Sequence, residues 1–130
     1  MDNEIPESLF IQILDEIFSE KEIRFAGFVN KKGDLDEGKF CEDIIPFEND
    51  DEQQQIFREL AIRISTRKKF DYSMGAVKYS ASRREKVVMM SFPLKNTSLL
   101  ITAEPNVNID RLAYKIIQII GKDWSEFYGE

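Results

Sequence analysis

The 130 residues are 42% hydrophobic and 32% charged, with a net charge of −6, and this balance predicts one globular domain over residues 1–130. The chain has no histidine and only one cysteine, Cys41. This composition rules out a His-dependent catalytic triad, the usual ligand sets of a zinc site and an intramolecular disulfide. The acidic balance argues against nucleic-acid binding, and the lack of a basic leader or of roughly 20 consecutive apolar residues favours a cytoplasmic protein without a membrane span.

The first half of the chain predicts a helix, a strand hairpin and a second helix. In segment 6–18, apolar residues recur at helical spacing and form one wide stripe. Segments 23–30 and 35–40 are typical of strands joined by a turn at 30–34, where Gly33 can adopt a positive φ. Asn49 or Asp50 can cap the second helix, whose apolar stripe consists of Ile56, Phe57, Leu60, Ala61 and Ile64.

The second half predicts three strands and a last helix. The strands are expected at about 73–82, 86–92 and 98–104, and their short connections favour antiparallel neighbours. Asn108 is a good cap for the last helix, and Gly121 is placed as its C-terminal stop. The core is therefore expected at about 6–121, followed by a tail at 122–130.

Two unbroken apolar runs, at 87–90 and 99–101, indicate strands without a polar face. Such runs fit the centre of a sheet that helices cover on both faces. The sequence therefore predicts an α+β fold, a five-stranded antiparallel sheet with helices on both faces in the order α-β-β-α-β-β-β-α. A strand with one face in a dimer core would bury the same residues.

This order of elements, with the glycine-turn hairpin FAGFVNKKGDLDEGKF at 25–40, resembles the Roadblock/LC7 fold, a relative of profilin-like and longin domains. The similarity covers roughly residues 9–121 in element order. Segment 79–110 is also similar to a small archaeal family to which no activity is assigned. The resemblance implies a non-enzymatic domain that forms homodimers or heterodimers and acts as a scaffold for motors, small GTPases or signalling complexes.

The resemblance further implies that the third strand, at about 74–82, lies at a sheet edge and pairs with the same strand of a second copy. The middle helix, at about 51–65, would then pack against its counterpart. A gatekeeper role for Lys78, which would keep this edge monomeric, is the alternative. The expected interface residues are Met74, Val77, Lys78, Tyr79, Ser80, Ala81, Phe57, Arg58 and Ala61.

Basic residues concentrate between positions 67 and 86. This segment has seven basic and two acidic residues, whereas the rest of the chain has 11 basic and 22 acidic residues. A basic patch on an acidic protein can dock an acidic partner, although a solvated hairpin tip and helix end would give the same pattern. Nucleic acid is disfavoured because few aromatic residues are interleaved. The candidate patch consists of Arg67, Lys68, Lys69, Arg83, Arg84 and Lys86.

Four other features favour structural roles. The acidic stretch 33–38 indicates a tight turn, since Ile45 occupies the place of the bidentate glutamate of a calcium loop. Carboxylates at 48 and 50–52 suit a helix start, and Cys41 has no histidine to activate it. The aromatic residues of the tail, which either pack on the domain or bind a partner, are Trp124, Phe127 and Tyr128.

The favoured hypothesis is a non-enzymatic scaffold or adaptor module that homodimerises and binds a protein partner, by analogy a small GTPase or a signalling protein. A small-ligand sensor of the profilin or PAS type is the alternative. Its signature would be a partly polar pocket, whereas the inward stripes are almost wholly apolar. An enzyme is least favoured, because no constellation of catalytic residues is arranged in the sequence, and no cofactor or metal is expected.

Overall fold

The computed structural model describes residues 6–121. The strands are β1 (Ile23–Asn30), β2 (Leu35–Phe40), β3 (Ser80–Arg83), β4 (Val88–Pro93) and β5 (Thr97–Ala103). The helices are α1 (Glu7–Ile17), α2 (Asp50–Arg67), α3 (Asp71–Met74) and α4 (Ile109–Gly121), and a 3-10 turn, η1 (Lys68–Phe70), joins α2 to α3.

The five strands form one antiparallel sheet in the order β2-β1-β5-β4-β3. The predicted α+β fold is therefore confirmed, and β3 lies at a sheet edge as expected. In β5 every residue is buried, and in β1 only the last residue is not. The apolar run at 99–101 thus lies at the centre of the sheet, as its lack of a polar face predicted.

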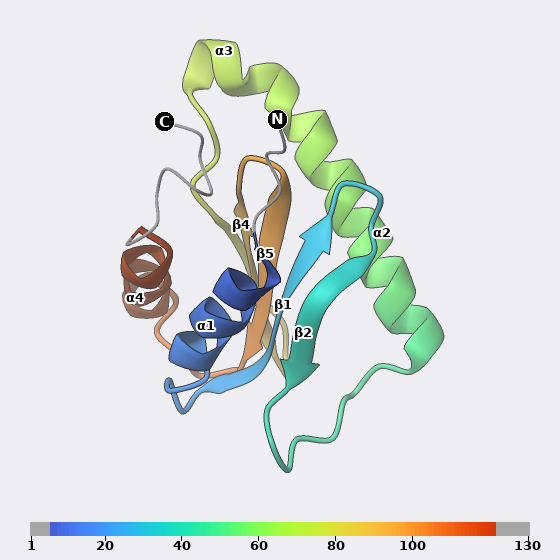
Figure 1. The fold of residues 1–130 in the computed structure, drawn as a ribbon, viewed down its shortest axis with the longest axis vertical. Coiled ribbons are helices and arrows are strands. Elements are labelled where there is room, and N and C mark those ends of the chain that lie inside the picture. The colour runs from blue at the N-terminus through green and yellow to red at the C-terminus, as the bar shows by residue number, and fades with distance from the viewer. Residues whose placement is uncertain (1–5, 122–130) are drawn as a thin grey trace.

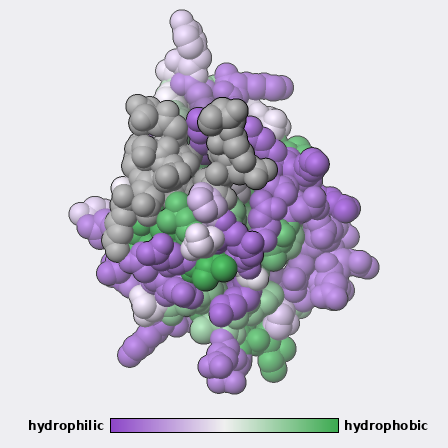
Figure 2. All heavy atoms as spheres, viewed as in Figure 1, coloured by the Kyte–Doolittle hydropathy of each residue, from purple (hydrophilic) through white to green (hydrophobic). Residues whose placement is uncertain are grey.

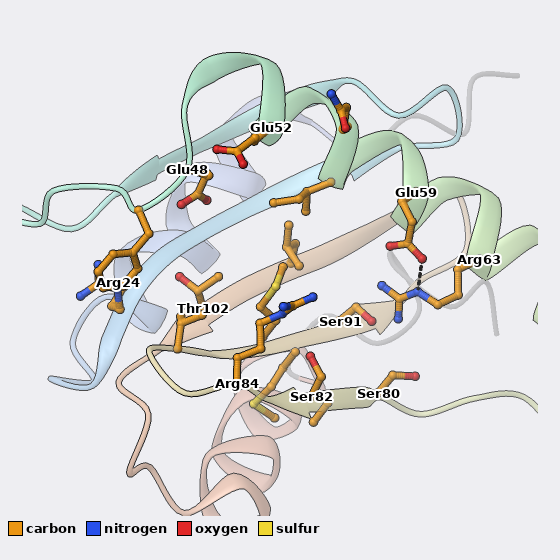
Figure 3. Close-up of a pocket in the computed structure, with 18 of the residues that line it drawn as sticks. Arg24, Glu48, Glu52, Glu59, Arg63, Ser80, Ser82, Arg84, Ser91 and Thr102 are labelled. Carbon is orange, nitrogen blue, oxygen red and sulfur yellow. Dashed lines mark hydrogen bonds and ion pairs between the residues drawn. The ribbon is translucent and has the colours of Figure 1, made fainter.

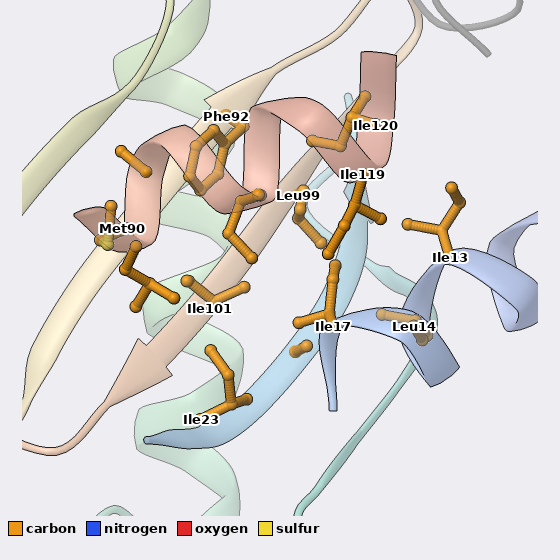
Figure 4. Close-up of a cluster of buried hydrophobic side chains, with 14 of the residues drawn as sticks. Ile13, Leu14, Ile17, Ile23, Met90, Phe92, Leu99, Ile101, Ile119 and Ile120 are labelled. Atoms are coloured by element: carbon orange, nitrogen blue, oxygen red, sulfur yellow. The ribbon is translucent and has the colours of Figure 1, made fainter. Parts of the chain in front are cut away.

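Helices cover both faces of the sheet (Figure 1). On one face α1 and α4 pack together over the larger cluster of buried side chains, which contains Ile17, Phe92, Ile101 and Ile120 (Figure 4). The stripes of both helices point into this cluster, since Phe10, Ile13, Leu14 and Ile17 of α1 are all buried. This face supplies most of the apolar burial in the described part of the chain.

The opposite face carries α2 alone. A smaller cluster fixes this helix to the sheet through Phe57 and Leu60, which pack with Phe25, Val29 and Leu100. The contacts involve β1 and β5, so α2 lies toward the β1 side of the sheet. The outer face of α2 is hydrophilic, and apolar atoms gather at the lower end of the molecule, where the connection from β2 to α2 runs (Figure 2).

The predicted boundary of the third strand is wrong. The chain does not change to a strand at about residue 73, because η1 and α3 prolong the helical path of α2 as far as Met74. Gly75 ends this path with a φ of 84°, and its N–H donates to the Asp71 carbonyl at 2.8 Å. Only 80–83 pair with β4, so β3 has four residues instead of the ten expected.

The predicted turn and caps are confirmed. Gly33 has a φ of 87° in the hairpin between β1 and β2. The Asn49 side chain accepts from the Glu52 N–H at 2.8 Å, and the Glu52 carboxylate accepts from the Asn49 N–H at 3.0 Å, which is a complete capping box. At α4, the Asn108 side chain accepts from the Arg111 N–H at 3.0 Å.

Candidate functional site

An open groove lies between α2 and the half of the sheet that α2 does not cover. Because Phe57 and Leu60 hold α2 over β1 and β5, this face of β4 and β3 remains accessible. The groove has a volume of about 1040 Å³, and strand and helix side chains line it from both sides (Figure 3).

The floor of the groove is partly polar. Side chains alternate along each strand, so Ser80 and Ser82 of β3 reach the same face as Ser91 of β4 and Thr102 of β5. Met89 and Leu100 lie among these hydroxyls. This differs from the expectation of almost wholly apolar inward stripes, which holds only for the face that α1 and α4 cover.

Ser91 is the deepest of these hydroxyl residues. It is 3% exposed and sits directly opposite Ser80 in the antiparallel register. Among the residues that the structure describes, the Ser91 side chain has no hydrogen-bond partner, although it lines the groove. Within the described residues no fully enclosed side-chain polar atom lacks a partner, so the Ser91 hydroxyl is accessible from the groove and can bond there to water or to a ligand.

Four arginines surround the groove. Arg67 Nη1 donates to Ser80 Oγ at 2.8 Å, and Arg63 Nε pairs with Glu59 at 3.2 Å. Arg24 is held by the Ile45 carbonyl, by Glu104 and by the ring of Phe47, 4.4 Å from its guanidinium. The fourth, Arg84, points toward the groove, and its side chain has no hydrogen bond or ion pair within residues 6–121.

A second, smaller cavity continues the groove toward the C-terminal end of α2. Its volume is about 200 Å³. Apolar side chains form much of its wall. Its charged lining residues include Lys68, Asp71 and Lys95. Four residues line both spaces, so they mark the junction between them: Arg63, Arg67, Ser80 and Ser91.

The structure divides the predicted basic patch. Arg67 and Arg84 line the groove and Lys68 the smaller cavity, whereas Lys69 lines neither. Arg83 instead donates to the carbonyls of Pro105 and Val107, because alternation turns it to the face opposite Arg84. The Lys86 ammonium lies 5.5 Å from the centre of the Phe47 ring.

Sequence reasoning missed Arg24 and Arg63. Arg24 lies in an otherwise apolar strand, and a lone charge in such a strand is a signal that it borders a polar space. Arg63 and Arg67 are four residues apart on a helix, and that spacing places them on one face. The spacing of Arg63 and Arg67 does not by itself reveal the site, because only the structure shows that Ser80 of β3 lies under α2.

Several of the predicted interface residues lie elsewhere than the sequence suggested. Met74 ends α3, and Val77, Lys78 and Tyr79 precede β3 instead of forming part of it. Phe57 is 7% exposed and faces the sheet of its own chain. Ser80 and Ala81 do lie on the edge strand, and Arg58 and Ala61 lie on α2 outside the buried cluster.

Tyr79 is tied to its own domain. Its ring stacks on Phe92 with 5.9 Å between ring centres, and its hydroxyl donates to Asp110 Oδ1 at 3.2 Å. Partial burial, together with the hydrogen bond and the negative charge of Asp110, raises the pKa of the Tyr79 phenol. On the opposite edge of the sheet, a side-chain hydrogen bond from the protonated Glu37 carboxyl to Glu7, desolvation and the charge of Glu7 raise the pKa of Glu37.

The remaining candidates give no reactive centre. Asn49 and Glu52 act as a helix cap, and Cys41 is half-buried directly after β2. Within residues 6–121 no group of three acidic, His or Cys side chains is placed to hold a metal ion. No helix in this part of the chain is long and apolar enough to cross a membrane. Trp124, Phe127 and Tyr128 lie outside the described residues.

Solved structures with the Roadblock/LC7 fold resemble this chain over most of its length. The Roadblock/LC7 domain from Streptomyces avermitilis has 10% sequence identity and a TM-score of 0.64, with 92% of this chain and 94% of that chain covered. A structure described as MglB with a tetrameric arrangement has 13% identity and a TM-score of 0.65, covering 92% and 93%. MglC from Myxococcus xanthus has 12% identity and a TM-score of 0.58, covering 88% and 94%.

These likenesses show that the chain has the Roadblock/LC7 fold, as the sequence resemblance implied. None of the curated proteins matches the sequence. The model of a family of unknown function, DUF6659, matches residues 4–130. Because this match spans nearly the whole chain, the chain belongs to that family.

Proposed function

We propose that this member of DUF6659 is a non-enzymatic adaptor of the Roadblock type, which homodimerises and presents a joint surface to a protein partner. The partner class that the fold suggests is a small GTPase or another signalling protein in the cytoplasm. One observation carries the proposal: within residues 6–121 the sheet ends in the edge strand β3, which pairs on one side alone and has no large or charged residue before Arg83.

The two edges of the sheet differ in their protection. Natural edge strands avoid pairing with other chains by carrying charged side chains or by being covered. The β2 edge has Asp36, Glu37 and Lys39, so it is protected in this way. The β3 edge begins Ser-Ala-Ser, which leaves its outward main-chain groups open to a strand of a second copy.

A strand of four residues supplies few hydrogen bonds, so a stable dimer needs apolar contact as well. Helix α2 has exposed apolar side chains that could supply this contact. Ile62 of α2 is 67% exposed, and Ala61 beside it is partly exposed. Packing of α2 against its counterpart would bury both side chains. The tetrameric arrangement described for MglB supports association as a property of this fold.

The hydrogen-bond pattern of the β3–β4 hairpin identifies the residue whose main chain faces outward. The Arg84 N–H donates inward to the Val87 carbonyl at 2.9 Å. Antiparallel pairs alternate between bonded and non-bonded positions, and the register therefore assigns inward bonds to Ser82 and Ser80. Ala81 lies between them, so its N–H points away from β4.

Substitution Ala81→Pro tests the dimer directly. Proline removes the outward N–H of Ala81 and leaves the inward ladder to β4 in place, so we expect monomers. Light scattering after size exclusion, over a dilution series, would give a mass near twice 15.2 kDa for the wild type and near 15.2 kDa for the variant.

The matched control is Ala81→Thr, which enlarges the side chain and keeps the N–H, and it should remain a dimer. A wild type that stays monomeric at every concentration would refute homodimerisation. A folded Ala81→Pro variant that remains a dimer would refute pairing through β3.

Ligand sensing is the second candidate function, and the polar floor of the groove favours it. Ser91 and Thr102 are buried residues whose hydroxyls face the groove, in contrast to the apolar packing under α1 and α4. Small-molecule sites combine apolar walls with a few placed polar groups, which describes this groove.

A further inference from the structure

We propose that the junction of the groove and the smaller cavity binds a small organic anion with an aromatic body. Its carboxylate or phosphate group would lie between Arg63, Arg67 and the paired hydroxyls of Ser80 and Ser91. Its ring would occupy the smaller cavity. This inference rests on the ligand-sensing candidate and is independent of homodimerisation.

The anion site is built from two pairs of residues. Arg63 and Arg67 project from the same face of α2, and Ser80 and Ser91 oppose each other on β3 and β4. All four line both the groove and the smaller cavity. Guanidinium groups bind carboxylate and phosphate oxygens through parallel N–H donors, and serine hydroxyls add further donors.

The donors are positioned and still have capacity. The 2.8 Å bond to Ser80 Oγ uses only Nη1 of Arg67, and the ion pair with Glu59 uses Nε of Arg63. Ser91 adds a donor at the junction, because the residue is 3% exposed, lines both spaces and has no side-chain hydrogen bond within residues 6–121. An oxyanion at the junction would accept a hydrogen bond from it.

The charge around the smaller cavity favours an anion. Arg63, Arg67, Lys68 and Lys95 line it, and Asp71 is the only acidic residue among the described residues that line it. The C-terminal carbonyls of α2 oppose an anion weakly. Helix-end effects fall off within one turn and are smaller than the attraction of several cations in a partly enclosed space, so the balance remains positive.

The walls of the smaller cavity define the body of the ligand. Ile64, Val77, Pro93 and Leu94 present apolar surface there. The cavity has about 200 Å³, and an apolar protein cavity of about 150 Å³ accepts benzene. A single ring attached to an anionic group therefore fits the space, and larger ring systems would extend into the groove.

Titration of the full-length protein by calorimetry tests this site with four probes. Phenyl phosphate and benzoate carry both required parts and distinguish a phosphate from a carboxylate group. Benzyl alcohol has the ring without the charge, and inorganic phosphate has the charge without the ring. We expect binding of one or both aromatic anions that is at least tenfold tighter than that of either partial probe.

Three variants assign the binding to the junction. Arg67→Gln and Ser91→Ala each remove one donor to the anion and should weaken binding by about tenfold or more. Lys69→Gln is the matched control, because it removes a nearby positive charge from a residue that lines neither space. This variant should bind the aromatic anions as tightly as the wild type does. Circular dichroism would confirm that each variant folds. If Arg67→Gln does not fold, Ser91→Ala alone tests the site.

Three results would overturn the inference. The first is that neither aromatic anion binds. The second is that a partial probe binds as tightly as the aromatic anions, and the third is that Lys69→Gln weakens binding as much as Arg67→Gln or Ser91→Ala does. Ala81 is not one of the four residues of the junction, so the mass of the wild type and of Ala81→Pro tests the dimer, and the calorimetry of the wild type and of Ser91→Ala tests this site. A wild type that binds phenyl phosphate as a monomer supports the anion site and refutes the dimer.

Discussion

Gly33 makes α2 and the β1–β2 hairpin fit together. Its φ of 87° is a conformation that L side chains rarely adopt, and a Cβ atom at this position would lie 2.8 Å from the Arg58 Cα. The Gln54 side chain also donates to the Gly33 carbonyl at 3.1 Å. A glycine is thus needed here for two reasons, the backbone conformation and the close approach of α2.

We expect Gly33→Ala to destabilise the fold through both effects. The left-handed conformation costs roughly 1–2 kcal/mol for alanine. Overpacking against the α2 backbone adds about 1–3 kcal/mol. Urea unfolding would measure the loss. The comparison Gly75→Ala adds a Cβ atom at a φ of 84° with no heavy atom within 4 Å, so its loss reports backbone strain without overpacking. A Gly33→Ala loss no larger than the backbone cost alone would show that α2 moves aside at no cost.

The raised pKa of Tyr79 links stability to alkaline pH. The folded state retains the phenol proton above the ordinary tyrosine pKa of about 10, so this contribution is complete below that pH and is lost as the pH rises through the folded-state pKa. We expect Tyr79→Phe to be less stable at neutral pH and to lose less stability on going to alkaline pH than the wild type.

Urea unfolding of both proteins on either side of about pH 10 would measure this difference. In the control Tyr114→Phe, which removes a phenol that is 67% exposed on α4, the alkaline loss should match that of the wild type. An unchanged pH dependence in Tyr79→Phe would show that Tyr79 does not carry the effect.

At the scale of the element, the capping box of α2 adds to the packing of Phe57 and Leu60 against the sheet. Only Phe57 and Leu60 of its 18 residues are buried, so local interactions contribute a large share of its stability. We expect Asn49→Ala to cost about 1 kcal/mol, because the Glu52 N–H then loses its acceptor. Thermal unfolding would measure it, and Asn49→Ser, which restores an acceptor, should remain near the wild type.

Element boundaries mark where sequence reasoning failed. The apolar residues of α1, β5 and α4 follow clear patterns along the sequence, and the bounds of each element were predicted to within about two residues. Segment 68–79 has no such pattern, and its helical part is fixed by local bonds that end at Gly75. The strand that was predicted there followed an alternation of residues of which Tyr79 packs on the sheet, through Phe92, although it precedes β3.

At the scale of the whole molecule, the fold was more predictable than the site. The apolar run at 99–101 lies in β5, which is buried throughout, whereas Met89 of the run at 87–90 lines the groove. These runs together with the element order favoured the architecture that the structure has. The site depends on which half of the sheet α2 leaves open. Ser80, Ser91 and Arg63 come from three elements, and nothing in their own sequence surroundings indicates that they meet.

The two faces of the sheet are unequal in a way that affects how the native state opens. Among the described residues, 20 buried side chains join α1 and α4 to the sheet, whereas five join α2. Proteins open in cooperative units whose free energies follow such burial. Helix α2 would therefore detach at a lower free energy than the rest, as a partial unfolding that leaves the larger cluster closed. A molecule bound under α2 would oppose this opening and make the helix exchange its amide hydrogens more slowly.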